Sequence, residues 1–319
     1  MPKTRSISLA LFLTATLATI PAQAAPHAKK PARQAPMQVA ITFDDLPVHA
    51  SLPPGVSRTD VAKSIIHALK AHHAPPIYGF VNATWIEKDP STAEVLRLWR
   101  AAGFPLGNHT LIHMDANANS VEAFEQNILA DEPTLEKYMA GKDWRWLRFP
   151  YLNAGDTPQK RKEIADFLAD HKYRAAMVTL SFGDYAYNDT YARCMAKGDK
   201  DAVDWMKQNF LDRASIDLMT GKEMSEADYG RDIKHVLLMH IGAFDAAMLP
   251  KLLDMYQKRG VKLISLPDAE SDPAYKDSAD PQIGFGGVLL EKKLAEKGLS
   301  VPVFANKNDD YYKLAGLCK

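Results

Sequence analysis

Short apolar runs alternate with amphipathic stretches of helical length from about residue 37 onward, so the sequence predicts an α/β fold built on a parallel sheet. The composition fits a folded globular protein, because 46% of the 319 residues are hydrophobic and 24% are charged. Lys plus Arg and Asp plus Glu both number 39, so no net charge draws the chain to nucleic acid or to an anionic membrane. We therefore expect a folded protein with no nucleic-acid partner.

The first 24 residues have the three parts of a secretory signal peptide. Lys3 and Arg5 precede an apolar run over residues 9–20, and the small residues Ala22 and Ala24 follow it. The run is shorter than the roughly 20 apolar residues that a transmembrane helix needs. We expect cleavage after Ala24, export to the periplasm or the extracellular space, and no stable membrane span.

The rest of the chain divides by composition and periodicity. Residues 25–36 are rich in Pro, Ala and Lys, which predicts a disordered leader. A domain of alternating strands and helices is expected over residues 37–270. Within it, residues 187–234 contain no strand-like run but carry apolar residues at helical spacing, which predicts a helical insertion before the last strands. Residues 271–319 are expected to form a tail with one short helix at 288–297.

The individual elements follow from the same patterns. Seven strands are expected, at residues 39–43, 77–81, 104–106, 146–148, 175–178, 236–239 and 262–264. Helices are expected between them at residues 58–73, 91–102, 120–139, 157–170 and 246–258. Ser120 and Thr157 are typical residues for helix starts, and Gly103 and Gly260 stand where helices end.

The chain contains two cysteines, Cys194 and Cys318. In an exported protein they can form a disulfide, which would tie the tail to the middle of the chain. Two unpaired buried thiols are the alternative, and the sequence does not choose between them.

Candidate catalytic residues begin at the end of the first expected strand, which runs directly into Asp44 and Asp45. Aspartates are common in turns, but the carboxyl ends of strands in parallel α/β folds also open into active sites. His109 and His113 follow the third expected strand and would share one face of a helical turn. A carboxylate with two imidazoles leaves positions open for water and substrate, as a catalytic zinc site requires. Zinc suits such ligands, and cobalt, nickel or manganese are compatible with them.

Three further charged or titratable residues stand at or after strand ends. Arg148 ends the fourth strand in the run Arg148-Phe-Pro-Tyr151, and it could pair with a carboxylate. Asp184 follows the fifth strand, and His240 ends the sixth. A lone histidine there is more often a core residue with satisfied hydrogen bonds, but Asp184 could hold it.

In this order, the motifs together resemble the polysaccharide deacetylase family, the NodB-homology carbohydrate esterases, over roughly residues 37–270. The matching motifs are Thr42-Phe-Asp44-Asp45, His109 to His113, Arg148-Phe-Pro-Tyr151, and an apolar strand that ends at His240. The resemblance implies a deformed (β/α) barrel of about seven strands and one bound divalent metal. It also implies hydrolysis of N- or O-acetyl groups, with an acetylated carbohydrate as substrate.

The resemblance also assigns roles to residues. Asp44 would be the catalytic base, and the metal ligands would be Asp45, His109 and His113. Arg148 would orient the base, and the backbone N–H of Tyr151 would face the oxyanion. His240 would be the general acid, held by Asp184. The chain departs from the family pattern at Met114, Ser181 and Tyr185, where the family usually has Pro, Asp and Trp, and these changes bear on the substrate groove.

The leading functional hypothesis is an exported, metal-dependent deacetylase of an N-acetylated glycan, either a cell-wall polymer or a chitin-type oligosaccharide. A hydrolase of another non-peptide C–N bond or of O-acetyl esters is one alternative. A non-catalytic glycan-binding module is another. The insertion leaves the chain after Asp184 and returns before His240, so we expect the insertion and the tail to lie at the barrel mouth. An oligomer contact is the alternative for its apolar residues Trp205, Met206, Phe210 and Leu211.

Overall fold

The structure is a computed structural model that describes residues 35–279, 288–301 and 307–319. Contacts within the chain separate residues 1–35 from residues 36–319, and the fold below is that of the second unit. The predicted signal peptide, residues 1–24, and the predicted leader up to residue 34 lie outside the described residues. In the described part, no helix combines the length and the apolar character needed to cross a membrane.

Seven strands form one sheet in which every pairing is parallel. They are β1 (Gln38–Leu46), β2 (Tyr78–Val81), β3 (Leu106–Asn108), β4 (Trp146–Leu147), β5 (Arg174–Ala175), β6 (Lys234–His240) and β7 (Lys262–Leu263). The order in space is β5-β4-β3-β2-β1-β6, and β7 pairs with the start of β1. Because the strands are parallel, their carboxyl ends lie at one end of the sheet.

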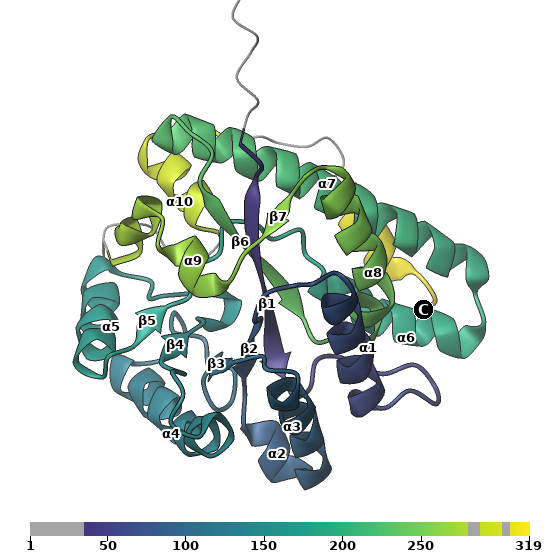
Figure 1. Ribbon diagram of the computed structural model, residues 1–319, viewed down its shortest axis with the longest axis horizontal. Coiled ribbons are helices and arrows are strands. Elements are labelled where there is room, and N and C mark those ends of the chain that lie inside the picture. The colour runs from purple at the N-terminus through teal and green to yellow at the C-terminus, as the bar shows by residue number, and fades with distance from the viewer. Residues whose placement is uncertain (1–34, 280–287, 302–306) are drawn as a thin grey trace, which may run out of the picture. The chain divides into compact units, whose positions relative to one another are not determined.

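Helices are arranged around the strands, as Figure 1 shows. The α-helices are α1 (Arg58–Ala71), α2 (Thr84–Lys88), α3 (Ala93–Ala101), α4 (Val121–Met139), α5 (Pro158–Asp170), α6 (Tyr185–Lys197), α7 (Lys200–Tyr229), α8 (Ala243–Lys258), α9 (Leu266–Glu270), α10 (Leu289–Glu296) and α11 (Lys307–Gly316). Three short 3₁₀ helices are η1 (Pro90–Thr92), η2 (Pro150–Leu152) and η3 (Pro273–Ala279).

The two faces of β1 show how the barrel is packed. Val39, Ile41 and Phe43 belong to the large core between the strands and the helices. The residues between them alternate to the other face, where Ala40 joins a separate cluster with Phe80, Trp146 and Val236. Both faces of β1 are buried, and burying a polar group without a hydrogen bond is costly. The polar residues at the carboxyl end of β1 therefore need specific partners.

The backbone of residues 176–180 nearly closes the barrel. It pairs with β4 through Ala176, whose N–H donates to the carbonyl of Leu147 at 2.7 Å. Four residues later it pairs with β6, because Leu180 and Leu237 form a parallel bridge. The sheet therefore curls into the deformed (β/α) barrel that the family resemblance implies, and this prediction is confirmed.

The insertion consists of α6 and α7. Asp199 caps α7 by accepting a hydrogen bond from the N–H of Ala202, and α7 ends at Gly230 in a left-handed conformation. Met206 and Phe210 are fully buried in the main core, and Trp205 and Leu211 pack against it. The ammonium of Lys313 in α11 lies 4.1 Å from the ring centre of Trp205. The apolar face of the insertion is thus covered within this chain, by the core and by the tail.

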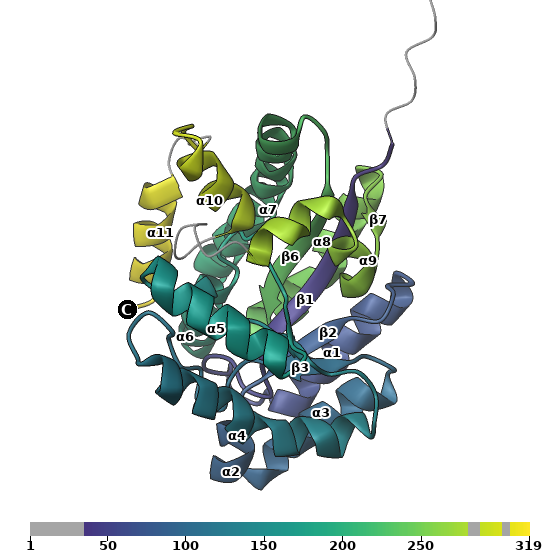
Figure 2. The same ribbon diagram turned by 90° about the vertical axis from the view of Figure 1, so that its left-hand side faces the viewer.

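The tail is fixed to the insertion by a disulfide between Cys194 and Cys318, so the two cysteines are paired. Figure 2 shows α11 beside α6, near the C-terminus. The structure places two described helices in the tail, α10 and α11, where the sequence predicts one. The sequence analysis missed α11 because Leu314 is its one buried apolar residue among the described side chains, which is too little for a visible apolar period.

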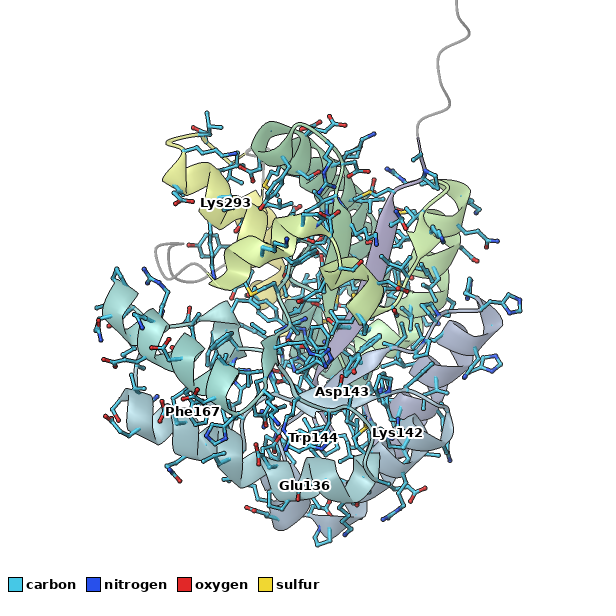
Figure 3. All side chains as sticks on the ribbon, turned by 60° about the vertical axis from the view of Figure 1, so that its left-hand side comes forward. Glu136, Lys142, Asp143, Trp144, Phe167 and Lys293 are labelled. Carbon is cyan, nitrogen blue, oxygen red and sulfur yellow. A yellow bond between two sulfur atoms is a disulfide. The ribbon has the colours of Figure 1, made fainter. Side chains whose placement is uncertain are left out.

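Other differences from the predicted elements have local causes. The third strand begins at Leu106 rather than at residue 104, because Pro105 has no N–H to donate to a neighbouring strand. Helices α2 and α9 have five residues each, too few to show a helical period. Trp144, which is labelled in Figure 3 in the loop before β4, is buried edge-on against Tyr173. Trp144 therefore anchors this otherwise exposed loop to the core.

Candidate active site

A bulge at the end of β1 turns two successive carboxylates toward one cavity. Phe43 pairs with Gly79 and Leu46 with Val81, so β1 has one residue more than β2 between these pairs. Within this stretch Asp45 has a φ of 65°, which a non-glycine residue seldom adopts. An extra residue re-aims the side chains that follow it, and strain of this kind is concentrated at functional sites.

Asp45, His109 and His113 converge on one point. The Oδ1 atom of Asp45 lies 3.4 Å from Nε2 of His109 and 3.5 Å from Nε2 of His113. His109 must donate through Nδ1 to the carbonyl oxygen of Arg148, at 2.7 Å, because a carbonyl only accepts. This leaves the lone pair of its Nε2 directed at the shared point, as in histidines that bind metals.

The protonation states of these residues suit a cation. Burial raises the pKa of Asp45, but the neighbouring His109 and His49 rings outweigh it and hold that pKa well below the usual range. Burial and then the neighbouring His109 lower the pKa of His113 to about 4. Asp45 Oδ1 is also buried without a hydrogen-bond partner among the described residues. The carboxylate of Asp45 and the imidazoles of His109 and His113 therefore fit a divalent metal of the type that zinc represents.

Asp44 lies next to these three residues but is ion-paired with Arg148. Nη1 of Arg148 lies 3.1 and 3.2 Å from the two carboxylate oxygens of Asp44. Nη2 of Arg148 donates to Thr42 Oγ1 and Nε donates to the carbonyl of Ala176. The guanidinium also lies over the ring of Phe80. Arg148 and Asp44 are both almost fully buried, so each charge depends on the other.

His240 and Asp184 form a second pair at the end of β6, where His240 is the partner of Asp44 in the sheet. Nδ1 of His240 lies 3.1 and 3.2 Å from the carboxylate oxygens of Asp184, which also accepts from the backbone N–H of His240 at 2.6 Å. Burial opposes the charged ring, but Asp184, with Asp45 and Asp44, raises the pKa of His240 to about 10. The ring is therefore protonated at neutral pH and can donate a proton.

A buried layer behind this pair comes from α6 and α8. Asn188 donates to Asp245 at 2.7 Å and accepts from the backbone N–H of Phe244. A side chain at Gly242 would meet Asn188 at 2.0 Å, so only glycine fits there. Burial and the nearby Asp184 raise the pKa of Asp245 well above its usual range, which favours its uncharged form. Sequence reasoning missed Asp245 and Asn188 because a buried polar pair leaves no spacing pattern.

His49 is a further site residue that the sequence analysis missed. Its Nδ1 donates to Asp45 Oδ2 at 2.7 Å, so the second oxygen of Asp45 is already occupied. Its ring lies 4.7 Å from that of His240, centre to centre. Asp45, His49 and His240 could also hold a cation together, but His240 is engaged by Asp184. The signal was present, because His49 follows Asp45 by four residues, as His113 follows His109.

One cavity of about 470 Å³ is lined by Asp44, Asp45, His49, His109, His113 and His240. The rest of its wall is mostly apolar and aromatic, and is formed by Phe149, Tyr151, Leu152, Tyr185 and Leu238, with Ser181. The ring of Tyr151 packs edge-on against His113, with 4.5 Å between ring centres. Such a cavity, mostly apolar with a few charged groups, is typical of a site for a small organic group. The structure thus brings every candidate residue from the sequence to one place.

Comparisons with known proteins agree with this arrangement. A family model described as polysaccharide deacetylase matches residues 32–176, which confirms the family resemblance. The match includes Asp44, Asp45, His109, His113 and Arg148, and it ends before Asp184 and His240. Comparison with curated protein sequences finds no match.

Solved structures share the fold. A chitin deacetylase from the fungal pathogen Colletotrichum lindemuthianum aligns with a TM-score of 0.52 and 20% identity, over 73% of this chain and 87% of the other. A mutant, with restored enzymatic activity, of a CE4 family pseudoenzyme from Bacillus anthracis aligns with a TM-score of 0.50 and 15% identity, over 74% of this chain and 68% of the other. At such identities the likeness establishes the fold alone.

Proposed function

We propose that this protein is an exported, metal-dependent deacetylase that hydrolyses N-acetyl groups of a glycan. The observation that carries the proposal is the convergence of a carboxylate, a three-residue metal set and a protonated histidine on one cavity. Amide hydrolysis needs these three functions: a base for water, a charge on the carbonyl oxygen and an acid for the leaving amine.

The metal set would consist of Asp45, His109 and His113. A divalent metal at these residues would supply polarisation of the acetyl carbonyl and a water of lowered pKa. The neighbouring His49 holds the second oxygen of Asp45, so Asp45 presents only Oδ1 to the ligand position. His109 is oriented in the same way by the carbonyl of Arg148.

Asp44 is the proposed base. Its carboxylate is fixed by Arg148 and lies 3.7 Å from Nε2 of His109, next to the proposed metal position. A buried carboxylate that is ion-paired rather than coordinated can accept the proton of an attacking water. The backbone N–H of Tyr151, whose ring packs against His113, is the proposed donor to the oxyanion.

His240 is the proposed acid. The ring is charged at neutral pH and its Nδ1 is held by Asp184, so Nε2 is the atom that can give a proton to the leaving sugar amine. The cavity would then hold a base, Asp44, and an acid, His240, beside the metal set. A binding module has no need for such an arrangement, which argues against the non-catalytic alternative.

Export is supported by the signal-peptide pattern of residues 1–24 and by the Cys194–Cys318 disulfide, since disulfides persist in oxidising compartments. The sugar-amide assignment is supported by the chitin deacetylase with the same fold.

The decisive experiment is acetate release from N-acetylated and O-acetylated glycans by the mature protein loaded with zinc, cobalt, nickel or manganese. N-acetylated chitin oligomers or peptidoglycan should release acetate, and Asp44→Asn protein with the same metal should not. Release from O-acetyl esters alone would favour the ester alternative. Glycan binding without acetate release from any substrate would show a non-catalytic protein.

A further inference from the structure

The C-terminal helix α11 lies along α6 in a fixed register. The Oγ1 of Thr190 donates to the carbonyl of Leu314, and Arg193 donates to the carbonyl of Leu317. Together with the Cys194–Cys318 disulfide, these contacts join residues 124 apart in sequence. Because the separation stays constant, the two helices run side by side in the same direction. The first turn of α11 therefore lies beside the first turn of α6.

The first turn of α6 is at the cavity. Asp184 precedes it, and Tyr185 lines the cavity with its ring edge-on to His240, at 5.6 Å between centres. The first turn of α11 is held there by Asn209 of α7, which donates to Asp310 at 2.9 Å and accepts from the hydroxyl of Tyr187. Tyr311 therefore lies close to Tyr185. Burial, and after it the phenol of Tyr311, raise the pKa of Tyr185, as expected for neighbouring hydroxyls.

These two tyrosines are half exposed, at 49% for Tyr185 and 45% for Tyr311. Arg213 of α7 adds a cation beside them, fixed by a hydrogen bond from its Nε to the carbonyl of Phe182. Tyr185, in the cavity wall next to the proposed acid, thus has a second exposed tyrosine and a guanidinium in its surroundings. None of the three belongs to a metal or base position.

We propose that Tyr185, Tyr311 and Arg213 form a subsite for a second sugar ring of the glycan, adjacent to the unit whose acetamide is hydrolysed. This inference rests on the proposed function and extends it to the length of chain that the enzyme prefers. Pyranose rings have apolar C–H faces and polar edges, which match exposed aromatic faces flanked by a hydrogen-bond donor. The cavity of about 470 Å³ is at the smaller end for ligand pockets, so a longer glycan must continue over its rim.

The main alternative is that these tyrosines contact a second copy of this chain, since exposed aromatic residues are common in such contacts. Continuity favours the sugar, because Tyr185 is at once a wall of the cavity and a neighbour of Tyr311. Tyr312 offers a matched control: it adjoins Tyr311 in α11 and is 74% exposed, and its ring is 6.2 Å from that of Tyr311.

The test compares steady-state deacetylation of the single sugar N-acetylglucosamine and of its four-unit oligomer by the mature, metal-loaded protein, because only the longer substrate has a second ring to fill the subsite. Tyr311→Ala should raise KM for the longer oligomer by about three- to tenfold, with kcat unchanged, because the subsite binds ground state and transition state alike. Tyr311→Phe should retain the native KM, and Tyr312→Ala should behave as the native protein. Size-exclusion chromatography of the three variants reports any change in oligomeric state.

Equal KM values of native and Tyr311→Ala protein on the longer oligomer would overturn the subsite, as would an equal loss in Tyr312→Ala. A loss of dimer in Tyr311→Ala that accompanies the change in KM would assign the surface to a second copy instead. Failure of the proposed function looks different, because the native protein would then release no acetate from either substrate, and the subsite would fall with it.

Discussion

The two sides of the cavity are built in different ways. On one side, Asp44, Asp45, His109, His113 and Arg148 come from the ends of β1, β3 and β4, all within the range that matches the family model. On the other side, Asp184 and His240 are supported by α6 and α8, and Tyr185 lines the cavity with Tyr311 of the tail near it. The metal side thus depends on strand ends and short motifs, whereas the acid side depends on an inserted helical layer and a disulfide-bonded tail. Changes on the metal side should therefore abolish chemistry, and changes to the residues that support the acid should tune it.

The largest expected effect is the loss of a metal ligand. His109→Ala or His113→Ala should abolish both metal binding and acetate release, because each removes one of three ligands. Metal content by elemental analysis and activity on the same sample check this. His67→Ala, at an exposed position in α1, is the control and should change neither. A full equivalent of metal in either site variant would contradict the assignment.

The next effect separates base from ligand. Asp44→Asn should reduce kcat by about 10²- to 10⁴-fold while the metal stays bound, because only the proton acceptor is lost. Asp45→Asn should lose metal and activity together. Metal titrations of the two variants distinguish them, and equal metal loss would mean that the two carboxylates share one role.

Replacing His49 tests whether a residue that contacts a metal ligand also affects metal affinity. His49→Ala should weaken metal affinity by about 10- to 100-fold, because Asp45 Oδ2 loses the donor that fixes its orientation. Competition with a chelator of known affinity measures the change. Native affinity in this variant would show that His49 does not position Asp45.

On the acid side, the pH dependence of activity should shift when Asp184 is replaced. The carboxylate of Asp184 raises the pKa of His240, so Asp184→Asn should lower that pKa toward 6.5 and shift the basic limb of the activity profile to lower pH. In the metal-free native protein the same raised pKa predicts stabilisation that is complete below 6.5 and is lost as pH rises toward about 10. Profiles of kcat/KM and urea unfolding at several pH values check both. An unmoved basic limb would remove Asp184 from the role of tuning the acid.

The smallest effect on chemistry should come from the disulfide. Replacing Cys194 and Cys318 together by Ser should lower the free energy of unfolding by about 2–4 kcal/mol, because the bond closes a loop with a sequence separation of 124. Turnover of the single sugar N-acetylglucosamine should change little, since none of the residues that line the cavity lies in α11. Preference for the four-unit oligomer over the single sugar should fall as in Tyr311→Ala. Urea denaturation and the two-substrate comparison measure these outcomes, and an unchanged unfolding midpoint would contradict the first.

The alternation of strands and helices and the motifs at strand ends could be predicted from the sequence alone. Asp44, Asp45, His109, His113, Arg148, Asp184 and His240 could be found because each follows an apolar run, and the carboxyl ends of parallel strands meet at one end of a sheet. The i, i+4 spacing of His109 and His113 also pointed to a shared direction, although the structure brings them together through a turn in which His113 has a φ of 57°. Strand-end placement is a local property, and local patterns are visible in one chain.

The contacts that surround these residues could be seen only in the tertiary structure. Asn188 fits against Gly242 and bonds Asp245 because two segments more than 50 residues apart in sequence pack without a gap, and no local pattern encodes such a contact. The pairing of Cys194 with Cys318 and the position of Tyr311 beside Tyr185 likewise depend on α11 lying along α6. These contacts depend on shape and distance between remote segments, whereas periodicity reports only which face of an element is buried.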